Sequence, residues 1–280
     1  HALDEDRFEL YFQPILSLEE IDFDNLPDSA SNLWVTHHRY RNSLPTYIES
    51  LIRLRDDEGD LVPPNLFLPS AERFDLMPKI DLWVIRNALK ILQEAHDLGL
   101  FFTLGVNLSA ITLEDQRAVS RILGYIRDMP IPSRHLAIEI TERSAITNMV
   151  GVKSFVETIN EMGCQFALDD FGAGFSSFAQ LRHLPVKYVK IDGEYIHNMD
   201  TDDTDRVIVT SINDIAHSIG RRTIAEYVTS ADILRSLRSC GVDYAQGFYI
   251  AKPMSKDKLF VIYDDEPTVL AVPYDAEVVL

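Results

Sequence analysis

Short apolar segments alternate with longer amphipathic segments along most of the chain. The short segments are rich in β-branched and aromatic residues, as strands are, and the longer ones repeat their apolar residues at helical spacing. The predicted strands are residues 8–16, 46–54, 101–109, 135–141, 165–170, 188–192, 222–226 and 244–250. Strands that alternate with helices in this way are typical of parallel βα units.

Several of the predicted helices end at a glycine, the residue that most often follows a helix. Three of them span residues 80–99, 150–163 and 204–220. Eight strands with such helices favour a (β/α)8 barrel, whose usual length of about 250 residues is close to the 280 residues here. An open doubly wound sheet is the alternative, but no G-x-G-x-x-G motif follows a predicted strand.

The first two predicted strands have no helical pattern between them. We therefore expect them to pair as an antiparallel hairpin and not through a crossover helix. The residues between them, 17–45, are interpreted as an inserted hairpin or flap, since residues 33–42 alternate like an exposed ribbon.

Composition and charge limit the possible partners. The chain is 46% hydrophobic and 25% charged, which suits one domain with a full core. Its formal charge of −18 argues against binding a nucleic-acid polymer, which requires a basic surface. Cys164 and Cys240 lack the spacing of a metal site.

The sequence contains no segment that is typical of membrane insertion or secretion. No apolar run approaches the roughly 20 residues that a spanning helix needs, and the first residues do not resemble a secretory signal. We therefore expect a soluble, intracellular domain. Because the sequence opens on His1 and not on methionine, we expect a fragment of a longer protein.

Polar side chains lie at or near the C-terminal ends of most predicted strands. They are Glu49, Asn107, Glu139, Asp169, Asp170, Lys190, Glu226 and Gln246. In a barrel these ends meet at one mouth, where barrel enzymes keep their chemistry. Any single acid here is more simply explained as the cap of a following helix. Together, however, so many carboxylates repel one another unless they take up protons or bind cations.

This all-oxygen set favours hard cations such as Mg²⁺ or Mn²⁺. Two such ions are the usual device for hydrolysing phosphate esters, so the sequence predicts a two-metal site. Lys190 could orient or help to deprotonate the attacking water, with Gln246 holding that water, or it could form a salt bridge that neutralises the acids. The residues alone favour neither role, and a barrel hydrolase acting on other phosphate esters also fits them. A glycosidase fits less well, because a carboxylate pair needs neither the asparagine nor the lysine.

Seven short motifs resemble, in order and spacing, those of the EAL domains, which hydrolyse bacterial cyclic di-GMP. They are YIESLIRLR, VNLSA, EITE, LDDFGAGFSS, YVKID, IAEYV and YAQGFYIAKP. The resemblance implies an α/β fold, a modified TIM (β/α)8 barrel with its first strand antiparallel, in agreement with the predicted hairpin. It also implies cleavage of cyclic di-GMP to linear pGpG with two Mg²⁺ or Mn²⁺ ions, and it argues against other phosphate esters.

The same resemblance assigns roles to individual residues. The first metal would be held by Glu49, Asn107, Glu139 and Asp169, and the second by Asp169 and Asp170, with Glu226 helping directly or through water. The predicted catalytic set is Glu49, Lys190, Glu226 and Gln246, in which Lys190 and Gln246 position the hydrolytic water. The predicted substrate contacts are Gln13, Leu51, Arg53 and Asp192, and Glu142 is the predicted anchor of the loop DFGAGFSS.

The chain departs from the family pattern at several points. Ser50 replaces the alanine of EAL, with little expected effect. Tyr227 and Thr229 replace the glycine and glutamate of AEGVE, which could crowd the second metal or loosen a contact around it. The link between Gln13 and Glu49 is longer by about twenty residues. These departures keep a rival hypothesis open, a catalytically weak or inactive cyclic di-GMP receptor, although the retained metal ligands favour the enzyme.

Partners and domain limits are predicted on the same resemblance. We expect residues 1–280 to form a single EAL-type barrel domain, with the insertion at 17–45 and a C-terminal tail at 265–280. We also expect a homodimer and an upstream sensory or GGDEF-type domain in the longer protein. The expected location is the bacterial cytoplasm, where segments before residue 1 could tether the domain to a membrane.

Overall fold

The computed structural model describes residues 7–27, 47–172 and 184–261, together with positions 3, 5, 33 and 182. Most of the predicted insertion at 17–45 lies outside these residues, and so does the ribbon predicted at 33–42, apart from position 33. The predicted tail at 265–280 and residues 173–177 of the DFGAGFSS loop also lie outside them.

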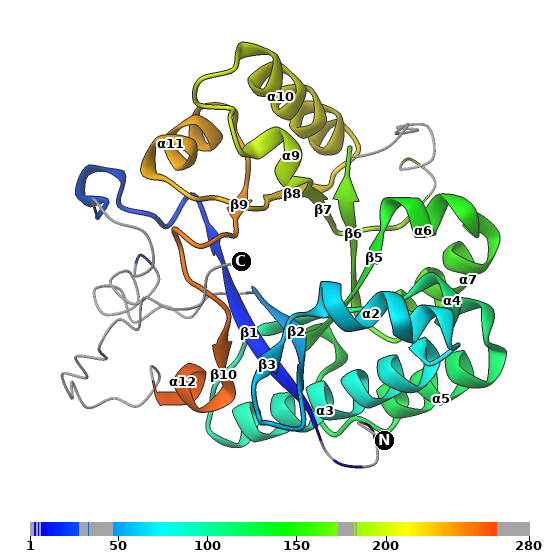
Figure 1. The fold of residues 1–280 in the computed structure, drawn as a ribbon. Coiled ribbons are helices and arrows are strands. Elements are labelled where there is room, and N and C mark those ends of the chain that lie inside the picture. The colour runs from blue at the N-terminus through cyan, green and yellow to red at the C-terminus, as the bar shows by residue number, and fades with distance from the viewer. Residues whose placement is uncertain are drawn as a thin grey trace.

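Eight strands in the described part of the chain close into a barrel (Figure 1). They are β1 (Phe8–Ser17), β2 (Tyr47–Arg55), β4 (Thr103–Asn107), β5 (Leu136–Thr141), β6 (Gln165–Phe171), β7 (Tyr188–Ile191), β8 (Arg222–Ala225) and β9 (Tyr244–Ala245), paired in that order, with β9 returning to β1. Pairs from β2 to β9 are parallel, whereas β1 is antiparallel to both of its neighbours. The predicted modified TIM barrel with an antiparallel first strand is therefore confirmed.

The antiparallel pairing of β1 with β2 fixes the position of the first candidate site residues. The register runs from Phe8 opposite Leu54 to Ile15 opposite Tyr47, and it places Gln13 opposite Glu49. Two short strands, β3 (Leu61–Val62) and β10 (Met254–Ser255), extend the sheet beside β2 and β1.

Helices lie around the outside of the barrel (Figure 1). They are α2 (Pro64–Arg73), α3 (Met77–Asp97), α4 (Ala110–Glu114), α5 (Gln116–Arg127), α6 (Glu142–Thr147), α7 (Met149–Glu161), α9 (Gly193–Ile196), α10 (Asp203–Ser218), α11 (Ala231–Ser239) and α12 (Lys256–Val261), with 3-10 turns η1 (Phe23–Asn25) and η2 (Ser133–His135). The three glycine-terminated helices of the sequence are α3, α7 and α10. Gly99, Gly163 and Gly220 follow them with φ of 75°, 90° and 73°, a conformation that costs glycine little.

The eighth strand is shorter than predicted, because it ends at Ala245 and not at residue 250. Beyond it the chain leaves the sheet and bonds to Val228, whose N–H donates to the Gln246 carbonyl and whose carbonyl accepts from the Tyr249 N–H. A Cβ at Gly247 would lie 2.2 Å from the Val228 nitrogen, so only glycine allows this approach. The apolar run predicts a strand through residue 250, whereas the glycine within it makes a close backbone contact that ends the pairing.

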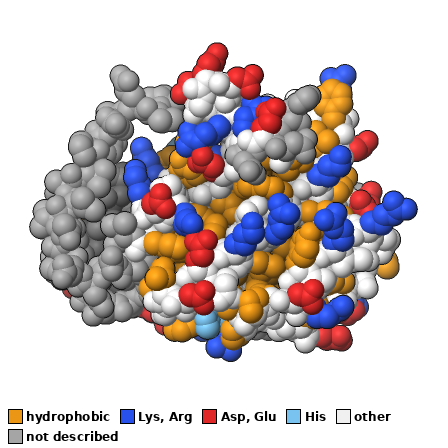
Figure 2. Space-filling view, turned by 90° about the horizontal axis from the view of Figure 1, so that it is seen from below, with side chains coloured by type: hydrophobic (Ala, Val, Ile, Leu, Met, Phe, Trp, Pro, Cys, Tyr) orange, Lys and Arg blue, Asp and Glu red, His pale blue; other side chains and the backbone are white. Residues whose placement is uncertain are grey.

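One face of the molecule carries both apolar and basic side chains. On the face seen from below in Figure 2, hydrophobic side chains gather at the middle with Lys and Arg among them, although the whole chain carries −18. In the described part of the chain, no helix has both the length and the apolar character needed to cross a membrane.

Candidate metal centre at the barrel mouth

An apolar and aromatic layer inside the barrel supports the polar residues of the mouth. Ile15, Tyr47, Ala137, Ala167, Tyr188 and Ile224 form this layer, with Tyr244 packed against it. The side chain two positions further along each parallel strand points to the same interior. Those side chains are Glu49, Glu139, Asp169, Lys190, Glu226 and Gln246, and on the antiparallel β1 the matching residue is Gln13, two positions earlier. Strand periodicity thus gathers seven predicted site residues in one layer.

Lys190 lies at the centre of this layer. Its Nζ is 2.9 Å from Glu139 Oε2, 2.9 Å from Asp169 Oδ1, 2.9 Å from Glu226 Oε1 and 3.3 Å from Glu49 Oε2. The lysine side chain is fully buried, and so is that of Glu139. A single buried ammonium therefore faces four carboxylates that are themselves buried or nearly so.

The ammonium and the acids shift one another's pKa. Burial alone would lower the pKa of Lys190, but the four carboxylates outweigh it and raise that pKa well above its usual range. Burial and the charges of neighbouring acids raise the pKa of Glu139 to about 7 and that of Glu226 well above its usual range, although Lys190 opposes both shifts. Lys190 is therefore the charged partner, and the acids hold their negative charge at a cost.

The neighbours of Glu49 stabilise its charged form. Its Oε1 accepts a 2.7 Å hydrogen bond from Asn107 Nδ2, and its Oε2 accepts one of 2.6 Å from Gln246 Nε2. Burial raises the pKa of Glu49, but Lys190 and these two amides lower it below its ordinary value. Gln246 also lies 3.2 Å from Gln13 Oε1, so β1 joins the same network.

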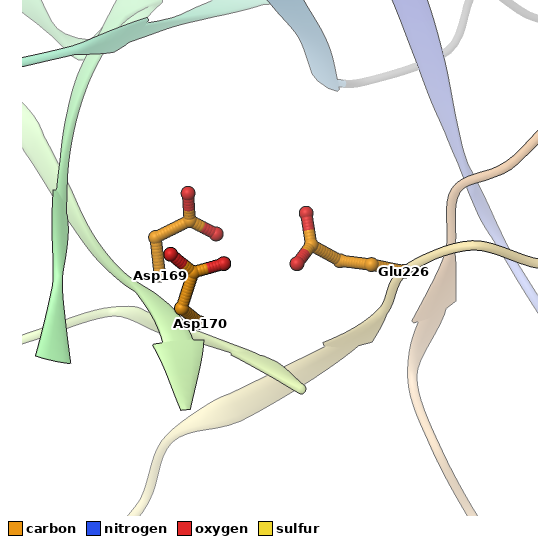
Figure 3. A group of neighbouring side chains, drawn as sticks. All are labelled: Asp169, Asp170 and Glu226. Atoms are coloured by element: carbon orange, nitrogen blue, oxygen red, sulfur yellow. The ribbon is translucent and has the colours of Figure 1, made fainter. Parts of the chain in front are cut away.

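Asp169, Asp170 and Glu226 form the closest group of possible cation ligands among the described residues. One carboxylate oxygen from each lies within 4.8 Å of the others, and Figure 3 shows the three groups turned toward one another from β6 and from the end of β8. Asp170 reaches this position through a left-handed backbone conformation, with φ of 52°. Burial, then the charges of Asp169 and Asp192, raises the pKa of Asp170 to about 6.

The residues present fit divalent cations. Glu139 Oε2 and Asp169 Oδ1 are buried, and each lies 2.9 Å from the Nζ of Lys190, whose three N–H donors are shared among four carboxylates. Buried acceptors of this kind are costly unless a cation or donor meets them. Because every ligand offered is an oxygen, hard cations suit the site better than metals that prefer sulfur or imidazole.

Two further predicted residues lie at the rim of the acid cluster. Glu142, the first residue of α6, accepts a 3.1 Å hydrogen bond at Oε2 from the N–H of Gly172, the third residue of the DFGAGFSS loop. This contact is what an anchor of the loop requires. Asp192 follows β7 and caps α9, with Oδ1 accepting from the Glu194 N–H at 2.7 Å.

The predicted substrate contacts on β2 lie above the acids. Leu51 and Arg53 follow Glu49 on the same face of the strand, where β2 continues past the acid layer, and both are half-buried. The Arg53 guanidinium lies 5.6 Å from the centre of the Tyr11 ring. Ser50, on the opposite face, is buried and donates a 2.7 Å hydrogen bond to the Gly105 carbonyl, so its hydroxyl is satisfied.

The sequence interpretation missed Tyr47 and Gly105. The Tyr47 hydroxyl donates a 2.7 Å hydrogen bond to Glu139 Oε1 from the layer below. A Cβ at Gly105 would lie 1.9 Å from that same oxygen, so the glycine leaves room for the carboxylate. Tyr47 stands two residues before Glu49 on its face of β2, and this spacing is the only signal that could have marked it.

Comparison with known proteins agrees with this geometry. The EAL domain family matches residues 37–253. A cyclic di-GMP phosphodiesterase, PdeB of Shewanella oneidensis, is 36% identical over 252 residues, which are 90% of this chain and 27% of that protein. The chain spans 27 to 31% of the length of the first three curated relatives that it matches.

Two solved structures share the fold. The PaMucR phosphodiesterase in complex with c-di-GMP has a TM-score of 0.79 and 26% identity, covering 92% of this chain and 96% of that one. The FimX EAL domain of Pseudomonas aeruginosa bound to c-di-GMP has a TM-score of 0.76 and 29% identity, covering 90% of this chain and 93% of that one. With the family match over most of its length, the chain belongs to the EAL domain family.

Proposed function

We propose that this domain is a phosphodiesterase that hydrolyses cyclic di-GMP to linear pGpG with two divalent cations, Mg²⁺ or Mn²⁺. The observation that carries the proposal is the buried layer of carboxylates around Lys190, in which one ammonium with three N–H donors faces four acids. The relatives named above are described as acting on or binding this dinucleotide, which supports the choice of substrate.

The proposed ligands divide between two positions. Glu49, Asn107, Glu139 and Asp169 would hold one cation, and Asp169 and Asp170, with Glu226, would hold the other. When bound, such ions lower the pKa of a water molecule and neutralise charge on the phosphate. Asn107 donates to Glu49 through Nδ2, so its Oδ1 is the ligand atom that it can offer.

Lys190 serves in this proposal as a donor and not as a base. Its raised pKa keeps the ammonium charged, so it can hold a water or a phosphate oxygen by a hydrogen bond. Gln246 supports the same position, since its Nε2 reaches Glu49 and its buried Oε1 accepts no hydrogen bond. That oxygen can accept a hydrogen bond from the water that attacks the phosphate and so hold it in place.

The substrate would lie over the acids, against the rim. Arg53 offers a fork of donors that suits a phosphate, and Leu51 offers an apolar edge on the same face of β2. Gln13 and Asp192 complete the proposed contacts from β1 and from the end of β7.

A receptor without turnover is the second candidate. It is favoured by the four ion pairs of Lys190, which engage carboxylates that the cations would need. If the Lys190 ammonium keeps its ion pairs and cations do not bind, the domain would bind the dinucleotide without cleaving it and pass the signal to a partner.

The decisive experiment is hydrolysis of cyclic di-GMP by the purified chain with Mg²⁺ or Mn²⁺, followed by chromatography for pGpG. We expect product from the wild type and from Glu58→Gln, which changes an exposed acid, and none from Glu49→Gln. Tight binding of intact dinucleotide without product would establish the receptor. Neither binding nor product would show that the proposal is wrong.

We further propose that the domain works as a homodimer in the bacterial cytoplasm, in a longer protein with an upstream sensory or GGDEF-type domain. The short coverage of the curated relatives supports the longer protein. Sedimentation of the purified chain tests the dimer.

A further inference from the structure

Tyr227 has a backbone conformation that tyrosine adopts at a cost. Its φ is 54°, and it follows Glu226 as Asp170, with φ of 52°, follows Asp169. For a bulky residue such a φ is an outlier, costing roughly 1 to 2 kcal/mol. Strained residues of this kind cluster at sites of function. Glycine would adopt this backbone at little cost, so the tyrosine side chain carries a conformational penalty that glycine would avoid.

The Tyr227 ring lies on Gly193, at the start of α9. A Cβ built on Gly193 would be 2.2 Å from Tyr227 Cδ2 and 2.5 Å from Cγ. Only a residue without a side chain leaves the ring this position. Gly193 follows Asp192, so the ring stands beside the rim of the acid cluster and does not fill the centre that Lys190 occupies.

The ring is nevertheless open to solvent. Tyr227 is 67% exposed, which is unusual for a large aromatic side chain held in a fixed position. Burial of part of the side chain raises the pKa of its phenol, and the charges of Glu226, Asp170 and Asp192 raise it further. The exposed aromatic surface therefore adjoins the acids that would hold the second cation.

We propose that Tyr227 is a specificity-determining residue whose ring stacks on one guanine base of the cyclic dinucleotide. The inference rests on the proposed function, since it assumes that a dinucleotide enters the mouth. A purine that leaves a phosphate over the acids needs a flat apolar surface at the rim, and base–aromatic stacking supplies about 1 to 3 kcal/mol per base. The position on Gly193 and the left-handed backbone hold such a surface in place before the ligand arrives.

The test compares Tyr227→Asn with Tyr227→Phe. Asparagine tolerates the left-handed conformation but has no ring, so we expect it to raise the Kd for cyclic di-GMP about tenfold. Phenylalanine keeps the ring and should bind like the wild type. Kd is measured by calorimetry in EDTA, and KM and kcat with Mn²⁺; KM should rise in Tyr227→Asn while kcat changes less than about twofold.

Thermal stability separates binding from structure. Because asparagine relieves the backbone penalty and the ring is largely exposed, the melting temperature of Tyr227→Asn should stay the same or rise. A structural role would lower it. Phe101→Ala is the matched control, since this exposed ring precedes β4 at the end of the barrel away from Asn107, and its Kd should not change.

Gly193 gives an independent test. Gly193→Ala pushes a methyl group into the Tyr227 ring and should raise Kd in the wild type. In the Tyr227→Asn background the ring is already absent, so the same change should have little further effect on Kd. Equal effects in both backgrounds would overturn the inference.

The outcomes also separate this inference from the proposed function. A wild-type chain that neither binds nor hydrolyses cyclic di-GMP would refute the proposed function. A wild-type chain that binds, with a Tyr227→Asn variant whose Kd is unchanged or lower, would refute the stacking role alone. A lower Kd would show that the ring obstructs the mouth.

Discussion

Tyr47 donates a 2.7 Å hydrogen bond from its hydroxyl to Oε1 of Glu139, and both side chains are buried inside the barrel. The opposite oxygen of Glu139 lies 2.9 Å from Lys190 Nζ. Glu139 is thus held by a phenol from the layer below and by an ammonium within its own layer. Burial, reinforced by the Glu139 charge, raises the pKa of Tyr47 well above its usual range, so the phenol remains a donor.

Tyr47→Phe removes the hydrogen bond and leaves the ring. Because a ligand without its orienting partner binds metal less well, we expect the affinity for Mn²⁺ to fall about tenfold. Calorimetric titration of the metal-free protein with Mn²⁺ measures it. Tyr188→Phe is the control, since Tyr188 stacks on Tyr47 with ring centres 5.1 Å apart in the same layer. A Tyr47→Phe protein with wild-type Mn²⁺ affinity would contradict the role of the hydrogen bond.

Gly105→Ala should displace the Glu139 carboxylate, because the added methyl group would occupy its position. The added Cβ would lie 1.9 Å from Glu139 Oε1, and buried side chains around it cannot easily move. We expect a loss of roughly 1 to 3 kcal/mol in the free energy of unfolding and weaker Mn²⁺ binding. Gly124→Ala in α5, where a Cβ meets nothing within 4 Å, should be neutral or slightly stabilising. Urea unfolding of both variants checks the difference, and equal effects would rule out crowding at Glu139.

Lys190→Met leaves four buried carboxylates without their cation. Breaking a buried ion pair in this way costs about 3 to 5 kcal/mol, so the metal-free variant should melt at a much lower temperature than the wild type. Divalent cations would replace the missing charge, so Mn²⁺ should raise the melting temperature more in the variant than in the wild type. Scanning calorimetry with and without Mn²⁺ makes the comparison. A smaller Mn²⁺ effect in the variant would show that the ion does not bind among these acids.

The stability of the metal-free protein should fall as the pH rises through neutrality. Glu139 has an ordinary pKa of 4.5 and one of about 7 in the folded protein, so the folded state binds the proton more tightly. Its contribution is fully present below pH 4.5 and is lost as the pH rises through about 7.

Glu139→Gln cannot titrate at this position, so its stability should depend less on pH over that range. Denaturant unfolding in EDTA from pH 5 to pH 8 tests it, with the wild type beside the variant. Parallel curves for the two proteins would exclude Glu139 as the group responsible. For the same reason, the wild type should bind Mn²⁺ more tightly as the pH rises through about 7, because the ion competes with the proton.

Much of the fold could be read from local patterns. The strands and the glycine-terminated helices follow from side-chain period, propensity and helix termination, which act within a few residues. The last strand was the exception, because Gly247 leaves the sheet to meet Val228, a contact with a distant segment. The sequence of residues 244–250 does not indicate that Val228 is the contact partner.

The sequence by itself determined which polar residues face the mouth, because the period of a strand places Glu49, Glu139, Asp169 and Lys190 on the interior face of successive strands. Only the tertiary structure decided how they meet: that one ammonium faces four acids, that Tyr47 holds Glu139, and that Tyr227 lies on Gly193. The physical reason is that charge, burial and close packing depend on distances between segments far apart in the chain, and these exist only when the barrel closes.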